Sequence, residues 1–316
     1  MLTQPIDDSF VAFDFEATLH SPVAYAFGLL GDRWTLRILQ NLFTGAKRFD
    51  ELRNRTQTTR GTLSSRLSHM VSIGLVYKNP HRSQKSIHEY GLTDKGLNLY
   101  PTALLFWKWE CRWGQGASTL PSALTHSVCG HTFEPLVVCS DCGQEVDSKH
   151  CTFELCTPQR HANTPPITLD NRRRRGPAMP LKEDTGFHSI EVLGDKWTGL
   201  IVSTLWFRER RFDEIVRALN ISTNILTNRL KLLAEYGILS REVGNPMSNH
   251  PIYKLTLKGR DLFGIAMLLH QWGERWVAEA SPPTLEVRHR CGAKLRPLVV
   301  CSHCAVKIQH REVLSH

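Results

Sequence analysis

The sequence predicts a mainly α-helical protein with small β elements, built from two tandem copies of one domain. The motif GDRW at 31–34 returns as GDKW at 194–197, and the offset of 163 residues holds without a gap as far as Trp113 and Trp276. Solenoid units span only ~20–50 residues, so this period indicates a duplicated domain. Within each copy, apolar residues recur at helical spacing. Each copy is followed by a short Cys-rich segment with strand-like apolar runs.

Bulk composition limits the kinds of partner. The 316 residues carry 39 Lys and Arg against 30 Asp and Glu, a formal net charge of +9 that suits a polyanionic partner. No apolar run is long enough to span a membrane, and the N-terminus lacks the basic start of a signal peptide. We therefore expect a cytoplasmic protein with no membrane partner. In that reducing compartment, the nine cysteines are better interpreted as metal ligands or redox groups than as disulfides.

Four helices are expected in the first half of each copy. In copy one, Pro22 opens the first helix, 34–43 has helical apolar spacing, and 48–53 forms a short third helix. Thr59 can cap a fourth helix that runs to about residue 73, because its hydroxyl accepts a backbone N–H of the first turn. Ser222 takes the same place in copy two.

The fourth helix carries candidate DNA-contacting side chains. Its apolar residues, such as Leu63 and Leu67, are spaced to face inward. The other faces hold small hydroxyl, amide and guanidinium groups, which read base edges and bind phosphates. A merely solvated face would more often carry Glu and Lys. The candidates are Arg60, Thr62, Ser64, Ser65 and Arg66 in copy one, and Thr223, Asn224, Thr227, Asn228 and Arg229 in copy two.

A hairpin and a last helix complete each copy. Gly74 and Gly237 end the fourth helix, and a strand, a polar loop, a return strand and a long helix follow. This order defines a winged helix-turn-helix. Candidate wing contacts to DNA are His81, Arg82 and Lys85 in copy one and Asn249 in copy two, although an ordinary surface hairpin remains an alternative.

The chain is thus divided into six parts. The winged helix-turn-helix domains occupy 21–119 and 184–281, and the Cys-rich β-hairpin modules occupy 120–147 and 282–316. Residues 1–20 form an N-terminal extension. Residues 148–183, which contain TPPIT and RRRRGP, are interpreted as a linker.

The ordered motifs resemble HxlR-type regulators of the MarR-like winged-helix superfamily. Copy one reads GDRWTLRIL, KRFDEL, LSSRLSHMVSIGLV, YGLTDKG and W-x3-W, and copy two reads GDKWTGLIV, RRFDEI, ILTNRLKLLAEYGIL, YKLTLKG and WGERW. The resemblance covers roughly 21–113 and 184–276. It implies DNA binding by the fourth helix with a wing beside it. It also implies homodimers joined through the first and last helices, and control of neighbouring genes.

Two departures from this family pattern matter. Some members sense oxidants through a Cys just before the first helix, where this chain has Ser21-Pro22 and Asp184-Thr185, so that route is absent. Single-copy members dimerise, whereas this chain holds two copies covalently. We therefore expect an intramolecular pseudo-dimer whose recognition helices lie about one DNA turn (~34 Å) apart. A further homodimer and a small-molecule effector stay open as partners.

The tryptophans of the last helices repeat at i, i+4. Trp109 and Trp113, and their counterparts Trp272 and Trp276, could line an effector pocket. Such an apolar stripe is more often domain or dimer core, and we favour that interpretation.

The Cys-rich segments have metal-ligand spacing. Copy one offers His126, Cys129, Cys139 and Cys142, and copy two offers His289, Cys291, Cys301 and Cys304. A CxxC pair and a second knuckle can complete a closed, structural Cys3His site for Zn2+ in each module. His131 competes with His126, but its counterpart is Ala293.

Alternatives to zinc are reduced hairpins without metal or a thiol switch at each CxxC. Cys151 and Cys156 lie in the linker beside His150 and His161. A surface pair without a role is favoured over a sensor of metal or oxidant.

The expected function is sequence-specific, DNA-binding transcription regulation by a covalent pseudo-dimer that reads two half-sites. The alternatives are a metal- or thiol-responsive sensor regulator and a protein-interaction adaptor that does not bind DNA. An enzyme is not expected, since the chain has no Gly-rich phosphate loop, no HExxH and no nucleophile elbow.

Overall fold

The computed structural model describes residues 21–80, 88–114, 120–155, 188–206, 210–242, 251–276 and 285–315. The N-terminal extension, most of the linker and Cys156 lie outside the described residues, as do the wing candidates His81, Arg82, Lys85 and Asn249. No helix in these ranges is long and apolar enough to cross a membrane.

Copy one has the helix order that the sequence predicts. Its elements are α2 (Pro22–Leu30), α3 (Arg33–Phe43), α4 (Phe49–Thr56), α5 (Arg60–Ser72), β1 (Val76–Pro80), β2 (His88–Leu92), α6 (Asp94–Leu97) and α7 (Tyr100–Trp113). Strands β1 and β2 pair antiparallel as the hairpin after the helix-turn-helix.

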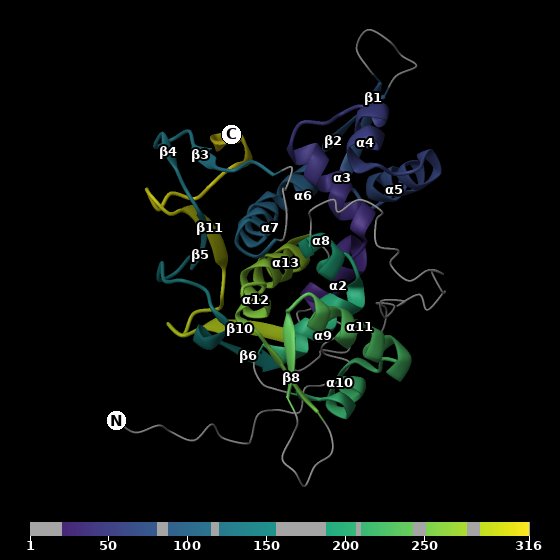
Figure 1. Ribbon diagram of the computed structural model, residues 1–316. Coiled ribbons are helices and arrows are strands. Elements are labelled where there is room, and N and C mark those ends of the chain that lie inside the picture. The colour runs from purple at the N-terminus through teal and green to yellow at the C-terminus, as the bar shows by residue number, and fades with distance from the viewer. Residues whose placement is uncertain are drawn as a thin grey trace.

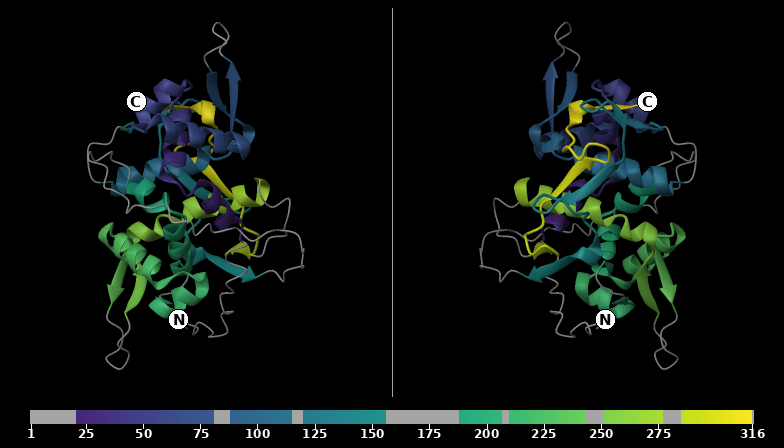
Figure 2. Two further views of the ribbon diagram at one scale, coloured as in Figure 1. Left: turned by 90° about the vertical axis from the view of Figure 1, so that its right-hand side faces the viewer. Right: turned by 90° about the vertical axis from the view of Figure 1, so that its left-hand side faces the viewer.

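Copy two repeats this order. Its elements are α8 (His188–Leu193), α9 (Lys196–Leu205), β7 (Arg210–Arg211), α10 (Phe212–Leu219), α11 (Thr223–Glu235), β8 (Leu239–Glu242), β9 (Ile252–Leu255), α12 (Leu257–Arg260) and α13 (Phe263–Trp276). The predicted fold class, two winged helix-turn-helix domains with small β modules, is confirmed. The two hairpins extend from opposite ends of the molecule (Figures 1 and 2).

The fourth helix of each copy, α5 or α11, is called its recognition helix. Both recognition helices begin where the capping residues predict. Thr59 accepts a hydrogen bond from the backbone N–H of Thr62 (3.2 Å), and Ser222 accepts one from Ile225 (3.4 Å). Such a cap contributes about 1 kcal/mol to helix stability. Helix α5 buries Leu63, Leu67 and Met70, and α11 buries Leu226, Leu230 and Leu233.

The two copies pack through their first and last helices. Helix α13 lies along α2 of the other copy, and α7 contacts α8. Trp109 and Trp272 are buried, and their indole N–H groups donate to the carbonyls of Lys258 (3.0 Å) and Lys95 (2.9 Å), each in the other copy. The interpretation of these two tryptophans as core residues is confirmed.

The Cys-rich segments are interlocked. Copy one contributes β3 (Leu124–His126), β4 (His131–Thr132), β5 (Pro135–Cys139), the 3-10 helix η1 (Ser148–His150) and β6 (Cys151–Leu155), and copy two contributes β10 (Leu285–His289), β11 (Pro297–Cys301), η3 (His310–Glu312) and β12 (Val313–Ser315). Strand β5 pairs antiparallel with β11, and the equivalent residues Val137 and Val299 stand opposite each other. Likewise β6 pairs with β10, and β12 with β3 (Figure 1). Each pairing therefore joins the two copies.

The predicted linker 148–183 begins too early. Residues 148–155 form η1 and β6, the counterparts of η3 and β12. The repeat is hidden there because the aligned residues share no identity, as Ser148 with His310 and Cys151 with Val313 illustrate. Cys151 is buried opposite His289, and burial raises the pKa of its thiol to about 12. Its interpretation as a surface thiol is therefore wrong.

Candidate nucleic-acid interface and metal centres

The predicted DNA-contacting residues of α5 are mostly exposed. Arg60, Ser64 and Ser65 face solvent, and the Arg60 guanidinium lies 5.7 Å from the centre of the Phe49 ring. Thr62 is half-buried, and its hydroxyl accepts a hydrogen bond from Thr59 (2.9 Å). The first two turns of the helix therefore present small polar groups and one cation.

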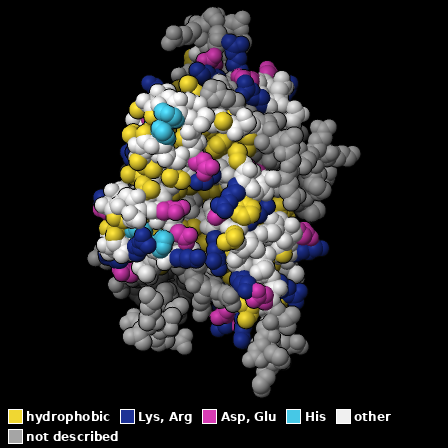
Figure 3. Space-filling view, turned by 60° about the vertical axis from the view of Figure 1, so that its left-hand side comes forward, with side chains coloured by type: hydrophobic (Ala, Val, Ile, Leu, Met, Phe, Trp, Pro, Cys, Tyr) yellow, Lys and Arg dark blue, Asp and Glu magenta, His cyan; other side chains and the backbone are white. Residues whose placement is uncertain are grey.

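Helix α11 presents a different set. Thr223, Asn224, Thr227 and Asn228 are all exposed. Both helices lie away from β5 and β11 in Figure 1. The opposite face, over the Cys-rich strands, mixes acidic, basic and hydrophobic side chains (Figure 3). The polar helix faces are thus distinct from the surface that the Cys-rich segments form.

Arg66 and Arg229 do not share the exposure of their neighbours. The Arg66 guanidinium lies 2.9 Å from the carboxylate of Asp32, and these side chains are only 18% and 16% exposed. Arg229 contacts both carboxylate oxygens of Asp195, at 3.1 and 2.7 Å. A two-point Arg–carboxylate contact fixes the orientation of both side chains. These ion pairs therefore fasten each of the helices α5 and α11 to its own copy. Contact of Arg66 and Arg229 with DNA stays a prediction.

The same two aspartates mark the contact between the copies. Asp32 caps α3 by accepting from the N–H groups of Trp34 and Thr35, and Asp195 caps α9 in the same way. The backbones of Asp32 and Asp195 meet in an antiparallel bridge. The repeated GD motif therefore lies on the pseudo-twofold axis.

Glycine is required beside each aspartate by close approach. A Cβ on Gly31 would overlap the Phe27 carbonyl oxygen of its own copy and stand 3.1 Å from the backbone nitrogen of Lys196. A Cβ on Gly194 would overlap the Ile190 carbonyl oxygen of its own copy and stand 2.9 Å from the Cα of Arg33. Real Cβ contacts are seldom so short. The Gly-Asp pair thus lets two backbones meet while its carboxylate holds the recognition helix.

Two clusters of potential metal ligands lie in the interlocked segments. One contains His126, Cys129, Cys301 and Cys304, and the other contains Cys139, Cys142, His289 and Cys291. The ligand atoms of each cluster lie within 4.8 Å of one another. Every predicted ligand is present, but each cluster takes a His-Cys knuckle from one copy and a CxxC knuckle from the other. The expected grouping within one module is wrong, because the strand pairing crosses between copies.

The spacing inside each cluster fits a tetrahedral ion. Cys129 and Cys301 sulfurs are 3.9 Å apart, and the Nδ1 atom of His126 lies 3.3 Å from the sulfur of Cys304. In the other cluster, His289 Nδ1 lies 3.3 Å from Cys142 and 3.4 Å from Cys291. Sulfur ligands ~2.3 Å from a tetrahedral zinc would be about 3.8 Å apart.

Outer groups orient the two histidines. The Nε2 atom of His126 lies 3.7 Å from the Glu312 carboxylate, and that of His289 lies 3.4 Å from the Glu145 carbonyl. Metal-bound histidines ordinarily place an acceptor at the ring nitrogen that is turned away from the ion. His131 lies outside both clusters and stacks on His303, with ring centres 3.6 Å apart. The donor sets could therefore each hold a metal ion.

The thiol pKa is lowered at one cysteine of each cluster, Cys291 and Cys301, and raised at another, Cys142 and Cys304. A hydrogen bond from the Ala293 backbone is the main cause that lowers the pKa of Cys291. Burial acts to raise the pKa of Cys301. Hydrogen bonds from the Cys304 and His303 backbone and from the Cys304 and Cys129 side chains outweigh burial, so this pKa is lowered. Thiolate, rather than thiol, is the form that binds metals.

Comparison with known proteins agrees with this geometry. The sequence profile of HxlR-like helix-turn-helix domains matches twice, at residues 29–118 and 192–281. The chain belongs to the HxlR-like helix-turn-helix family. An uncharacterized HTH-type transcriptional regulator of Mycobacterium tuberculosis is 36% identical over 132 residues, which cover 42% of this chain and 84% of the relative. An uncharacterized HTH-type transcriptional regulator of Synechocystis is 32% identical over 95 residues, which cover 30% of this chain and 70% of the relative. No solved structure matches.

The HxlR-like matches end before the Cys-rich strands begin. They stop at residues 118 and 281, whereas β3 starts at Leu124 and β10 at Leu285. The metal-ligand clusters thus lie outside the two matched regions. The residues of both clusters were identified from the spacing of cysteine and histidine in the sequence.

Proposed function

We propose that this HxlR-like protein is a non-enzymatic, cytoplasmic transcription regulator that binds two half-sites of one DNA operator as a covalent pseudo-dimer. The observation that carries this proposal is the pair of exposed polar helix faces, α5 and α11, held on two copies that meet at Asp32 and Asp195. The names of its relatives as transcriptional regulators support it, as does the formal net charge of +9.

The two reading surfaces differ, so the operator should be an imperfect palindrome. Arg60, Ser64 and Ser65 of α5 are replaced in α11 by Thr223, Thr227 and Asn228. Guanidinium favours guanine edges and an amide favours adenine edges, whereas hydroxyls discriminate less. Each half-site should therefore have its own preferred bases.

Binding to the chain's own upstream DNA tests the proposal. We expect saturable binding whose affinity falls steeply with salt. Replacing Ser64 and Ser65 by Ala should weaken binding to one half-site, and replacing Thr227 and Asn228 by Ala should weaken binding to the other. Ser72→Ala, at the far end of α5, is the matched control that should leave affinity unchanged. Absence of salt-dependent binding would contradict the proposal.

We further propose that both clusters hold structural Zn2+. Three thiolates and one imidazole fill a tetrahedral site and leave no open position for chemistry. Zinc would supply a cross-link between the copies, since each ligand set draws on both. Protein purified without chelators should contain about two zinc ions per chain. A zinc content near zero would contradict this assignment.

A single chain should suffice for DNA binding. HxlR-type homodimers are joined through the first and last helices of their subunits. Here the equivalent contacts, α2 with α13 and α8 with α7, are made within one chain. Light scattering should therefore give a mass near 36.0 kDa for free protein. Twice that mass at dilute concentration would indicate a further homodimer.

A further inference from the structure

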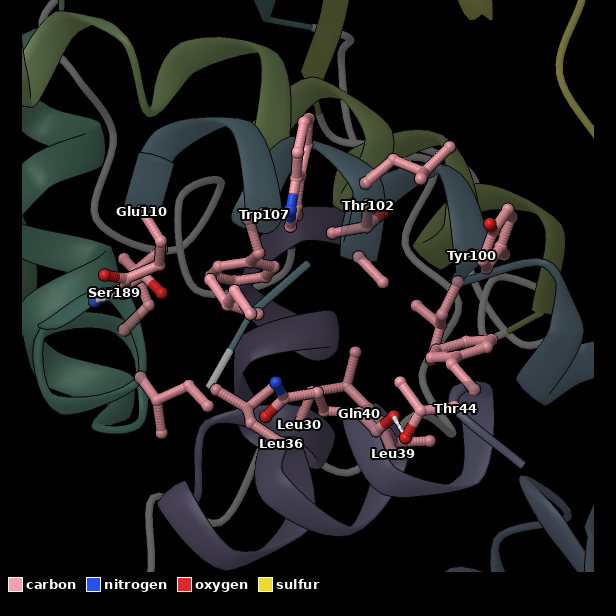
Figure 4. A pocket seen from close by; sticks show the side chains of 18 of the residues that line it. Leu30, Leu36, Leu39, Gln40, Thr44, Tyr100, Thr102, Trp107, Glu110 and Ser189 are labelled. Carbon is pink, nitrogen blue, oxygen red and sulfur yellow. Dashed lines mark hydrogen bonds between the residues drawn. The ribbon is translucent and has the colours of Figure 1, made fainter. Parts of the chain in front are cut away.

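A cavity of about 280 Å³ lies where the two copies meet. Its walls come from α2, α3 and α7 of copy one, α8 of copy two and the C-terminal Cys-rich segment. Figure 4 shows Leu30, Leu36 and Leu39 across the cavity from Trp107. Most of the remaining lining is also apolar. An apolar cavity of ~150 Å³ accepts benzene, so this one has room for a molecule of two fused rings.

One end of the cavity is polar. Glu110 and Ser189 lie together there (Figure 4), although they belong to different copies. Glu110 is 5% exposed, and one of its carboxylate oxygens accepts a short hydrogen bond from the Ser189 backbone N–H. The Ser189 side chain is 1% exposed, and its hydroxyl has no hydrogen-bond partner among the described residues. Buried hydroxyls in native proteins ordinarily have a partner, so this one is available to a polar group placed in the cavity.

The opposite end is lined by aromatic groups. Tyr100 and His310 meet edge to face with ring centres 4.6 Å apart, and the His310 ring nitrogen lies 3.3 Å from the Phe43 carbonyl. His310 belongs to η3, so the Cys-rich segment of copy two covers the cavity of copy one.

This polar end is not repeated at the equivalent contact. The residue equivalent to Glu110 is Gly273, where an added Cβ would overlap the backbone of Pro22, so α13 and α2 pack directly together. The residue equivalent to Ser189 is Ala26, which is fully buried. The carboxylate and the hydroxyl are therefore particular to the α7–α8 side.

We propose that the cavity binds a neutral, apolar effector of two-ring size that carries one hydroxyl or amino group. That group donates to the Glu110 carboxylate and accepts from the Ser189 hydroxyl, while rings fill the apolar part. A carboxylate only accepts hydrogen bonds and repels anions, so acidic analogues are excluded. The ligand contacts both copies and α3, which carries the cap residue Asp32 next to Arg66. Its regulatory effect rests on the proposed DNA binding.

Three probes of one shape test the cavity: 2-naphthol, naphthalene and 2-naphthoate. Calorimetry on the full chain without DNA should give one site for 2-naphthol, at least tenfold tighter than for the other two, because a hydrogen bond to a charged group contributes ~1.5–3 kcal/mol. Equal affinities for the three probes, or no saturable binding of any, would overturn the proposal.

Variants separate ligand binding from folding. Glu110→Gln should weaken 2-naphthol binding about tenfold and reduce the discrimination against 2-naphthoate. Ala103→Phe fills the cavity without touching the polar end, and should abolish binding in a protein whose melting temperature is retained. The matched control, Glu154→Gln on the surface, should bind as the parent does. Full 2-naphthol affinity in Ala103→Phe would place the ligand elsewhere.

Regulation is measured with the chain's upstream DNA. Saturating 2-naphthol should change DNA affinity at least threefold, and Glu110→Gln should remove this response. An unchanged affinity would overturn the regulatory part of the proposal. Absent DNA binding with intact 2-naphthol binding would contradict the proposed function and leave the cavity assignment standing.

Discussion

Asp32 and Asp195 are equivalent residues of the two copies, and their backbones meet in an antiparallel bridge while their carboxylates hold Arg66 and Arg229. The contact therefore forms a continuous path from α5 to α11. It consists of two ion pairs and one backbone bridge. We infer that this path fixes the separation of the two recognition helices.

Arg66→Gln should act differently from Arg60→Gln. Arg60 is exposed and free to reach a phosphate, so its loss should reduce the salt dependence of DNA binding by about one unit of slope. Arg66 is bound to Asp32, so its loss should weaken affinity with the slope unchanged. Asp32→Asn should reproduce the Arg66→Gln effect, and the double variant should be no worse than either. A reduced slope in Arg66→Gln would show a direct phosphate contact instead.

Gly31→Ala should destabilise the protein by about 1–3 kcal/mol, the usual cost of forcing a methyl group into packed structure. The new Cβ would overlap the Phe27 carbonyl oxygen in α2 and also press on the Lys196 backbone across the copy contact. Gly61→Ala is the matched control, because a Cβ there meets nothing within 4 Å and Ala favours the helix. Denaturant titration measures both. Equal stability of Gly31→Ala and the parent would argue against a tight contact at the pseudo-twofold axis.

Pairs of cysteine substitutions distinguish crossed metal sites from sites within one module. Cys129→Ala with Cys301→Ala removes two ligands of one cluster and should leave about one zinc per chain. Cys129→Ala with Cys139→Ala removes one ligand from each cluster and should lower zinc towards zero. Metal analysis of both double variants distinguishes the two arrangements. If each site lay within one copy, Cys129→Ala with Cys139→Ala would leave about one zinc, and Cys129→Ala with Cys301→Ala would leave none.

His270 should make stability depend on pH. Burial lowers its pKa from 6.5 to about 4, with Glu274 at 3.8 Å opposing the shift and Lys294 adding to it. The folded pKa lies below the unfolded one, so stability is complete above pH 6.5 and falls towards pH 4, by up to about 3 kcal/mol.

His270→Phe should reduce the fall in the free energy of unfolding between pH 6.5 and 4, compared with the parent. His69→Phe, on the exposed face of α5, should leave that fall unchanged. Unfolding titrations between pH 4 and 8 provide the comparison. Parallel curves for the parent and His270→Phe would contradict the assignment.

Periodic and local signals predicted much of this molecule. Apolar spacing located Leu63 and Leu67, hydroxyl caps located Thr59 and Ser222, and the repeat offset located the second copy. The helix and cap signals depend on residues within a few turns of one another, and the repeat is detected by comparing the sequence with itself. Sequence spacing is sufficient for them.

Contacts between distant segments were less accessible. Both copies have the same knuckles, so spacing could not show that His126 lies with Cys304 rather than Cys142. A helical pattern likewise cannot reveal that Arg66 turns towards Asp32, or that Glu110 meets Ser189. The Arg66–Asp32 pair forms only when copy one has folded, and the other two relationships exist only after the copies have packed together.

Changing the spacing of the half-sites tests the central claim most directly. Once the bound segment of upstream DNA is mapped, five base pairs inserted at its centre turn one half-site by about half a helical turn. A chain whose recognition helices are fixed through Asp32 and Asp195 should then lose most of its affinity, by about a hundredfold or more, and bind no better than to one half-site. Undiminished affinity for the lengthened operator would contradict a protein that binds two half-sites with recognition helices at a fixed separation.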